Sequence, residues 1–156
     1  MDSIRHHGTI NILLKYCGWA ASGIACDINC VISQVIIKLS SHGHRTSCKE
    51  GMIFVSHDPI DVETTQIFDR FTKEDWESYI DCYFDAGDPD DADDPIAWFR
   101  IPSREREAVI HLNHRAGKYV LIKLLQTDAV YEKIDLQYIG FIGYSGARAF
   151  ASARLC

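Results

Sequence analysis

Two stretches decide the fold: YVLIKLL at residues 119–125 and IDLQYIGFI at residues 134–142. Both are rich in β-branched and aromatic residues, which fit the pleated, half-buried surface of a strand. Glycines and an aspartate bound them, and such residues end strands in turns. The two stretches therefore predict two strands and anchor a β-rich interpretation of the whole chain.

Shorter strand patterns surround this pair, at residues 30–39, 51–56, 95–101 and 107–112. The segments between them carry turn signals, such as Pro59 and the polar NHRAGK at residues 113–118. One short amphipathic helix is expected at residues 72–83, where Thr72 is a suitable N-cap and apolar residues recur every three or four positions. Short strands spaced by about 10–15 residues favour an antiparallel β-sandwich or jelly roll with one or two short helices.

The amino-terminal region has a different pattern. Residues 11–25 are apolar without clear alternation and fit a helix, although each of its two glycines weakens a helix by about 1 kcal/mol relative to alanine. Lys15 interrupts this run well before it reaches the roughly 18 apolar residues of a membrane span. We therefore expect residues 1–30 to form a segment of uncertain structure, residues 31–150 to form the sandwich domain, and no segment to span a membrane.

Composition excludes several classes of function. The chain has 156 residues, the size of one domain, and its 22 acidic side chains outnumber 16 basic ones for a net charge of -6. This balance disfavours nucleic acid as a partner, because phosphate backbones are bound by basic surfaces. The six cysteines are unevenly spaced in a chain long enough to fold without disulfides. We therefore predict reduced thiols and a cytoplasmic location.

The strands at residues 117–125 and 134–143 resemble the closing strands of galactose-binding-like β-sandwiches, a superfamily that includes discoidin domains and the DOC domains of large ubiquitin ligases. The resemblance covers about residues 50–145. The tryptophan signature near the first helix of those domains has only an imperfect counterpart in Asp75-Trp76-Glu77-Ser78. The resemblance implies a jelly-roll recognition module without chemistry, whose loops at one end of the sandwich bind a ligand. It also implies a link to the ubiquitin pathway, as a substrate-recruiting fragment of a larger protein.

The candidate binding residues lie in turns or are arginines. His57 and Asp58 follow the strand at residues 51–56, and Arg100 and Arg115 are suited to contact an acidic group. We expect a protein or peptide ligand, no cofactor and no catalytic residue. An incomplete sandwich would also expose an edge strand and tend to associate.

Two other classes of function stay open. Cys26, Cys30, His42, His44 and Cys48 are zinc-type ligands, but their spacing is looser than in most zinc sites, so a small zinc-stabilised interaction domain is the alternative. The acidic stretch at residues 85–94 lacks the EF-hand pattern and is interpreted as a solvated loop without a metal. An enzyme would need a site formed only in three dimensions, from groups such as His111 and His114.

Overall fold

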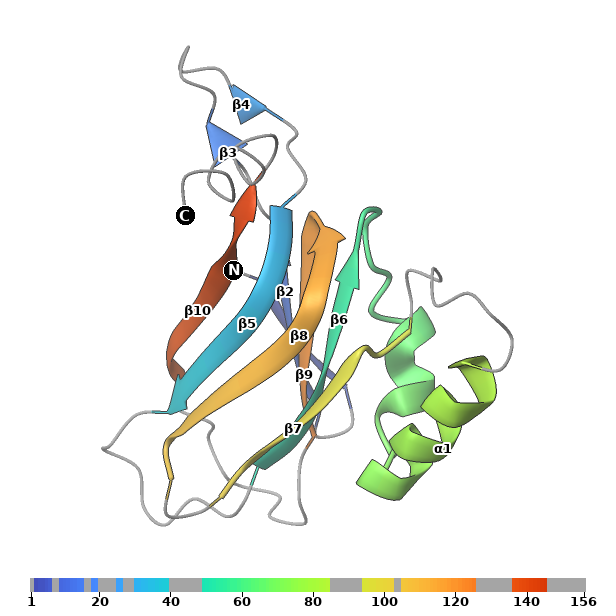
Figure 1. Ribbon diagram of the computed structural model, residues 1–156. Helices are drawn as coiled ribbons and strands as arrows, with labels where there is room; N and C mark the ends of the chain where they lie inside the picture. Colours follow the sequence, from blue (N-terminus) through green and yellow to red (C-terminus); the bar gives the residue numbers. More distant parts are fainter. Residues whose placement is uncertain are drawn as a thin grey trace.

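The computed structural model describes residues 2–6, 9–15, 18–19, 25–26, 30–39, 49–84, 94–102, 105–125 and 136–145. These residues form an antiparallel β-sandwich with one α-helix beside it (Figure 1). The elements are β1 (Asp2–His6), β2 (Thr9–Lys15), β3 (Gly18–Trp19), β4 (Ala25–Cys26), β5 (Cys30–Leu39), β6 (Lys49–Ser56), the 3-10 helix η1 (Thr64–Phe68), α1 (Lys73–Phe84), β7 (Ala97–Ile101), β8 (Glu107–Gly117), β9 (Tyr119–Leu125) and β10 (Leu136–Ser145).

Two sheets of unequal width form the sandwich. The five-stranded sheet has the order β1-β2-β9-β6-β7, and the three-stranded sheet has the order β10-β5-β8. Every strand pair in them is antiparallel. Strands β3 and β4 pair only with each other. The predicted fold class, a mainly β antiparallel sandwich with a short helix, is therefore confirmed, while the jelly-roll topology stays a prediction.

The main core lies between the two sheets. Alternation along each strand sends one set of side chains inward, as in β5, where Ile32, Val35 and Ile37 are buried. They pack with inward residues of the wider sheet, including Ile53 and Ile122. The three-stranded sheet therefore has one buried face and one outer face.

The outer face of the five-stranded sheet is covered by η1 and α1 (Figure 1). Thr72 is the N-cap of α1, as predicted: its Oγ1 accepts a hydrogen bond from the Asp75 N–H at 3.2 Å, and Asp75 Oδ2 accepts one from the Thr72 N–H at 3.0 Å, which together form a capping box. Phe68 packs edge-on against Phe54 of β6 and Tyr79 of α1. The helical segment thus has its own apolar cluster against the sheet.

Two local expectations were wrong. Residues 9–15 form β2 rather than the start of a helix, because they pair with β9 along six consecutive positions, from Ile10 opposite Leu124 to Lys15 opposite Tyr119. Residues 113–117 continue β8 rather than forming a turn, and His114 takes a positive φ of 48° where the pairing with β5 shifts. In the described part of the chain, no helix is long and apolar enough to cross a membrane.

Candidate functional site

Strand β10 lies at a free edge of the three-stranded sheet. Among the described residues it pairs only with β5, so its other edge has no neighbouring strand. Its sequence, LQYIGFIGYS, contains no charged residue and no proline. Edge strands of soluble proteins usually carry such residues, because unpaired backbone groups beside apolar side chains recruit other strands. The edge strands β1, β7 and β8 all contain charged residues. Within the two sheets of the sandwich as described, β10 is therefore the one edge strand without a charged residue, and we call it the unprotected edge.

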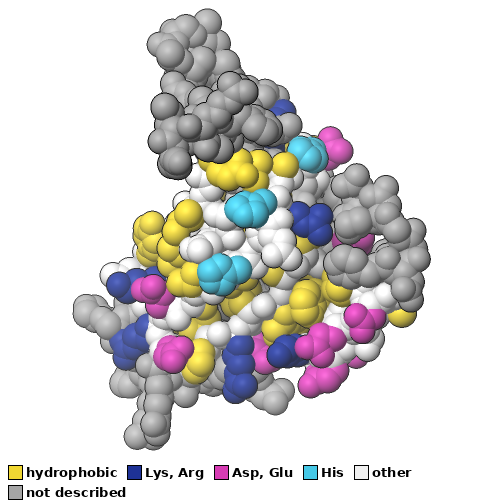
Figure 2. All heavy atoms as spheres, in the orientation of Figure 1, with side chains coloured by type: hydrophobic (Ala, Val, Ile, Leu, Met, Phe, Trp, Pro, Cys, Tyr) yellow, Lys and Arg dark blue, Asp and Glu magenta, His cyan; other side chains and the backbone are white. Residues whose placement is uncertain are grey.

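Large apolar side chains are exposed on both faces of β10. Tyr138, Ile142 and Tyr144 point outward, because they pair with Lys38, Gln34 and Val31 on the outer face of β5, and they are 45–53% exposed. Figure 2 shows hydrophobic side chains gathered over the β10 side of this face, with histidines beside them. Phe141 is opposite the fully buried Val35 and thus faces inward, yet it is still 42% exposed. Phe141 is exposed although it faces inward because no described strand lies beside β10 on its other side.

A cavity lies under β10, between the two sheets. Its volume is about 480 Å³, within the range of roughly 300–1,000 Å³ that is usual for ligand pockets. Its apolar walls come from β2, β5, β9 and β10 and include Leu14, Cys30, Ile32, Val120, Ile139 and Phe141. The cavity therefore continues the free edge of β10 into the interior of the sandwich.

Cys30 contributes an apolar wall to this cavity rather than a reactive group. Its thiol donates a hydrogen bond to the carbonyl oxygen of Gly117, with an Sγ···O distance of 3.3 Å. Burial raises the pKa of the Cys30 thiol, so it stays protonated near neutral pH. A protonated buried cysteine behaves as a small apolar side chain. The structure describes one other cysteine side chain, Cys82, which is also a free thiol.

A second, more polar groove lies along the opposite side of the sandwich, where β7 and β8 meet. Its volume is about 470 Å³, and its lining includes Trp76, Trp98, Arg100, His111 and Asn113. Trp98 is partly buried on the outward face of β7, where it packs against the apolar cluster under the helical segment. The indole Nε1–H of Trp98 is buried and has no hydrogen-bond acceptor among the described residues.

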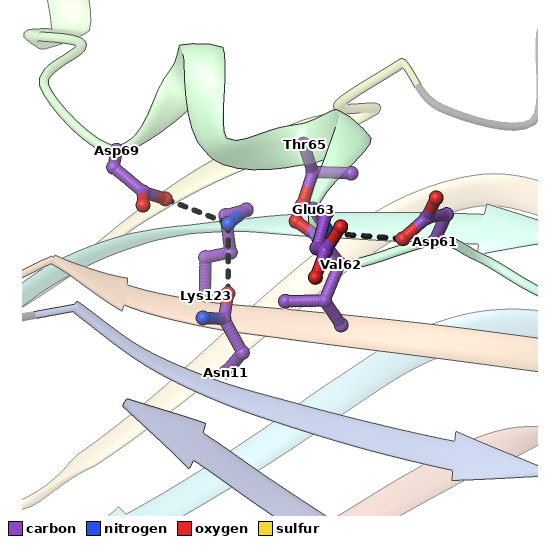
Figure 3. A network of polar contacts seen from close by, with 7 residues as sticks. All are labelled: Asn11, Asp61, Val62, Glu63, Thr65, Asp69 and Lys123. Carbon is purple, nitrogen blue, oxygen red and sulfur yellow. Dashed lines mark hydrogen bonds and ion pairs between the residues drawn. The ribbon is translucent and has the colours of Figure 1, made fainter. Parts of the chain in front are cut away.

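The most buried charge in the described chain belongs to Lys123 of β9. Its ammonium donates to Asp69 Oδ1 and to Asn11 Oδ1, both at 2.7 Å (Figure 3). The Lys123 side chain is fully buried and that of Asp69 is 10% exposed. Burial lowers the pKa of Lys123, and the Asp69 carboxylate partly opposes this effect. Because Asp69 follows η1 and Lys123 lies on β9, this ion pair links the end of η1 to the five-stranded sheet.

The four residues predicted as a binding site are not gathered in one place. His57 and Asp58 are exposed just after β6, where the Asp58 N–H donates to Ser56 Oγ. Arg115 is half-buried near the end of β8, which lies at the same end of the sandwich because the Lys118 N–H bonds the Ser56 carbonyl. Arg100 lies towards the other end, opposite Glu50. Their binding role stays a prediction.

The predicted metal alternatives fall largely outside the described residues. This holds for His42, His44, Cys48 and all but one residue of the stretch 85–94, and for the side chain of Cys26. The exception in that stretch, Asp94, accepts a hydrogen bond from the Tyr79 hydroxyl. No group of three potential metal ligands occurs among the residues that the structure describes.

Sequence reasoning missed the unprotected edge, although a signal for it was present. The absence of charge from residues 136–145 is visible in the sequence. It identifies an unprotected edge only once the strand is known to lie at an edge, since the same composition suits a central strand.

Comparison of the chain with protein-family models, curated proteins and solved structures finds no match.

Proposed function

We propose that this chain is a non-catalytic recognition domain that binds an extended apolar segment of a partner protein along β10. The observation that carries the proposal is the uncharged edge of β10, with large apolar side chains exposed on both of its faces. A segment that pairs with such an edge gains backbone hydrogen bonds, while alternate side chains supply specificity.

The unequal width of the two sheets supports this interpretation. The wider sheet has two more strands than the narrower one, and the cavity is lined by β10, an edge strand of the narrower sheet. A strand added beside β10 would cover the inward face of Phe141 and continue the outward apolar surface of Tyr138, Ile142 and Tyr144. One occupant thus accounts for the free edge, the exposed side chains and the cavity.

The predicted ligand class, a protein or peptide, is retained in this proposal, but its location is changed. The site is an edge strand rather than the loops at one end of the sandwich. Kinship with galactose-binding-like domains and a link to the ubiquitin pathway rest on the resemblance at residues 117–125 and 134–143 and stay predictions. So does a cytoplasmic location.

The test is a selection of random nine-residue peptides displayed on phage against the immobilised full chain. We expect the recovered peptides to alternate apolar and polar residues and to lack proline. Ile142→Lys places a charge on the free edge at an outward position that is 48% exposed, so it should remove binding without disturbing the core. Val109→Lys is the matched control, because Val109 is 47% exposed on the same outer face but lies on β8.

The two variants separate the outcomes. Recovery of alternating peptides that bind the wild type and Val109→Lys, but not Ile142→Lys, supports strand addition. Peptides without alternation, or equal binding to all three proteins, contradict it.

A further inference from the structure

Gly143 is the position on β10 where the free edge and the cavity meet. It pairs with Ile32, whose side chain is buried, and it lines the cavity. A Cβ at this position would lie 2.0 Å from the carbonyl oxygen of Val31, which no side chain tolerates. The pairing shift between Ile142 and Gly143, where Ser33 bonds the Ile142 carbonyl at 2.9 Å, brings the two strands this close. Position 143 must therefore be glycine, and no side chain from this position enters the cavity.

A neighbouring strand would place side chains at regular intervals against this edge. Residues two apart on a strand face the same side and lie about 7 Å apart. The inward positions of an added strand would therefore lie beside Ile139, Phe141 and Gly143. Only beside Gly143 is there no side chain to compete for space, and aromatic residues pack well across from a strand glycine.

From this geometry we infer that the bound segment carries one aromatic residue, at the inward position beside Gly143, and that its ring enters the cavity. This inference rests on the proposed function, because it assigns the residue that strand addition would insert. The cavity suits an aromatic ring by its volume of about 480 Å³ and its walls of Leu14, Ile32 and Val120. Phe141, exposed at the rim, offers the inserted ring an edge contact.

Among the described lining residues, Cys30 is the buried titratable group, and its state supports an apolar occupant. The Cys30 thiol is protonated, and its hydrogen bond is satisfied by Gly117. Lys15 is also in the lining, but its ammonium lies 5.7 Å from the centre of the Tyr119 ring, which packs with the cluster on the other face of the sheet. The buried part of the cavity wall, formed by Cys30, Ile32 and Val120, therefore offers apolar contacts to an aromatic ring.

The test uses two fluorescein-labelled heptapeptides that alternate threonine and valine and differ only in their central residue, phenylalanine or alanine. Binding to the full chain is measured by fluorescence anisotropy. A ring in a desolvated pocket acts as a hot spot, so we expect the alanine peptide to bind roughly 30-fold more weakly. If the two peptides bind the wild type equally and neither binds Ile142→Lys, the inferred aromatic residue is overturned but strand addition is not. Failure of both peptides to bind overturns the proposed function as well.

Two cavity variants test the location of the ring. Ile139→Trp fills the cavity from its own wall, so the preference for phenylalanine should fall to about twofold or less, whereas Val109→Trp on β8 should leave it unchanged. Because Ile139→Trp risks unfolding, Val120→Ala is the second variant: it enlarges the cavity and should shift the preference from phenylalanine to tryptophan. An unchanged preference in both folded variants overturns the placement of the ring.

A second copy of the chain is the competing occupant. Sedimentation velocity of the wild type and of Ile142→Lys distinguishes it. A monomer in both cases is expected. A wild-type dimer that Ile142→Lys dissociates and that the phenylalanine peptide does not compete with would assign the edge to self-association and overturn the inference.

Discussion

Replacing Asp69 with alanine should destabilise the protein strongly, because it leaves a buried charge without its counter-ion. The Lys123 ammonium is fully buried and its two described acceptors are Asp69 Oδ1 and Asn11 Oδ1, both at 2.7 Å. After the substitution, Asn11 supplies one neutral acceptor to a group with three donors. In the wild type no part of the Lys123 side chain is exposed to water.

The size of the effect follows from the burial of the pair. Removing one partner of a buried ion pair typically costs about 3–5 kcal/mol. Proteins of this size are stable by about 5–15 kcal/mol, so the loss is a large fraction of the total. With a urea m-value of about 2 kcal/mol/M, the unfolding midpoint should fall by roughly 2 M.

Urea unfolding followed by circular dichroism measures this change for Asp69→Ala, Lys123→Met and the double variant. The methionine removes the charge and keeps much of the volume of the lysine stem, so the double variant should recover most of the stability lost in Asp69→Ala. Glu63→Ala is a control for loss of an exposed acid in the same segment, and it should change stability by less than about 0.5 kcal/mol. A loss under about 1 kcal/mol in Asp69→Ala would refute the reasoning, since it would mean that Lys123 is hydrated or neutral without Asp69.

Further predictions concern pH and the helix cap. Because burial lowers the pKa of Lys123, the unfolded chain binds more protons than the folded protein between that lowered pKa and 10.5. The free energy of unfolding, followed as the urea midpoint, should therefore rise with pH in this window, and the rise should be absent in Lys123→Met. Asp69→Asn lowers the pKa of Lys123 further, so in this variant the rise should begin at a lower pH than in the wild type. The Cys30 thiol acts in the opposite direction: its raised pKa means that stability falls as pH rises through 9.0, and the difference in urea midpoint between Cys30→Ala and the wild type should report this. Thr72→Ala removes the side-chain half of the capping box and should cost about 1 kcal/mol, measured by thermal unfolding, whereas the exposed Ser78→Ala in the same helix should not.

Strands with a clear local pattern could be predicted from the sequence. Residues 30–39 and 119–125 form β5 and β9 with the expected bounds, because β-branched residues and flanking turns both favour a strand there. Thr72 and Asp75 likewise identify the start of α1, since a capping box is made by residues three apart. Each of these features depends on neighbours in the chain.

Features that depend on distant partners could not be predicted. Residues 9–15 are apolar enough for either a helix or a strand, and pairing with β9, over 100 residues later, decides between them. Lys123 is a charged residue within the apolar strand YVLIKLL, and its burial is explained only by the ion pair with Asp69, which lies 54 residues earlier in the chain. Arg100 and Arg115 are suited by residue type to contact an acidic group, but no local signal indicates that β7 and β8 place them apart.

The position of β10 conflicts with its composition, and this conflict is the best argument for a missing neighbour. A strand that is apolar on both faces is typical of the interior of a sheet, where strands pair on both sides. The same composition made residues 134–142 one of the two strongest strand signals in the chain. In the described structure, however, only β5 pairs with β10, while Tyr138, Phe141 and Ile142 stay exposed. Because no other described strand pairs with this edge and its apolar side chains are exposed, a single added strand would satisfy both the backbone groups and the side chains. Separate small ligands on each face would not.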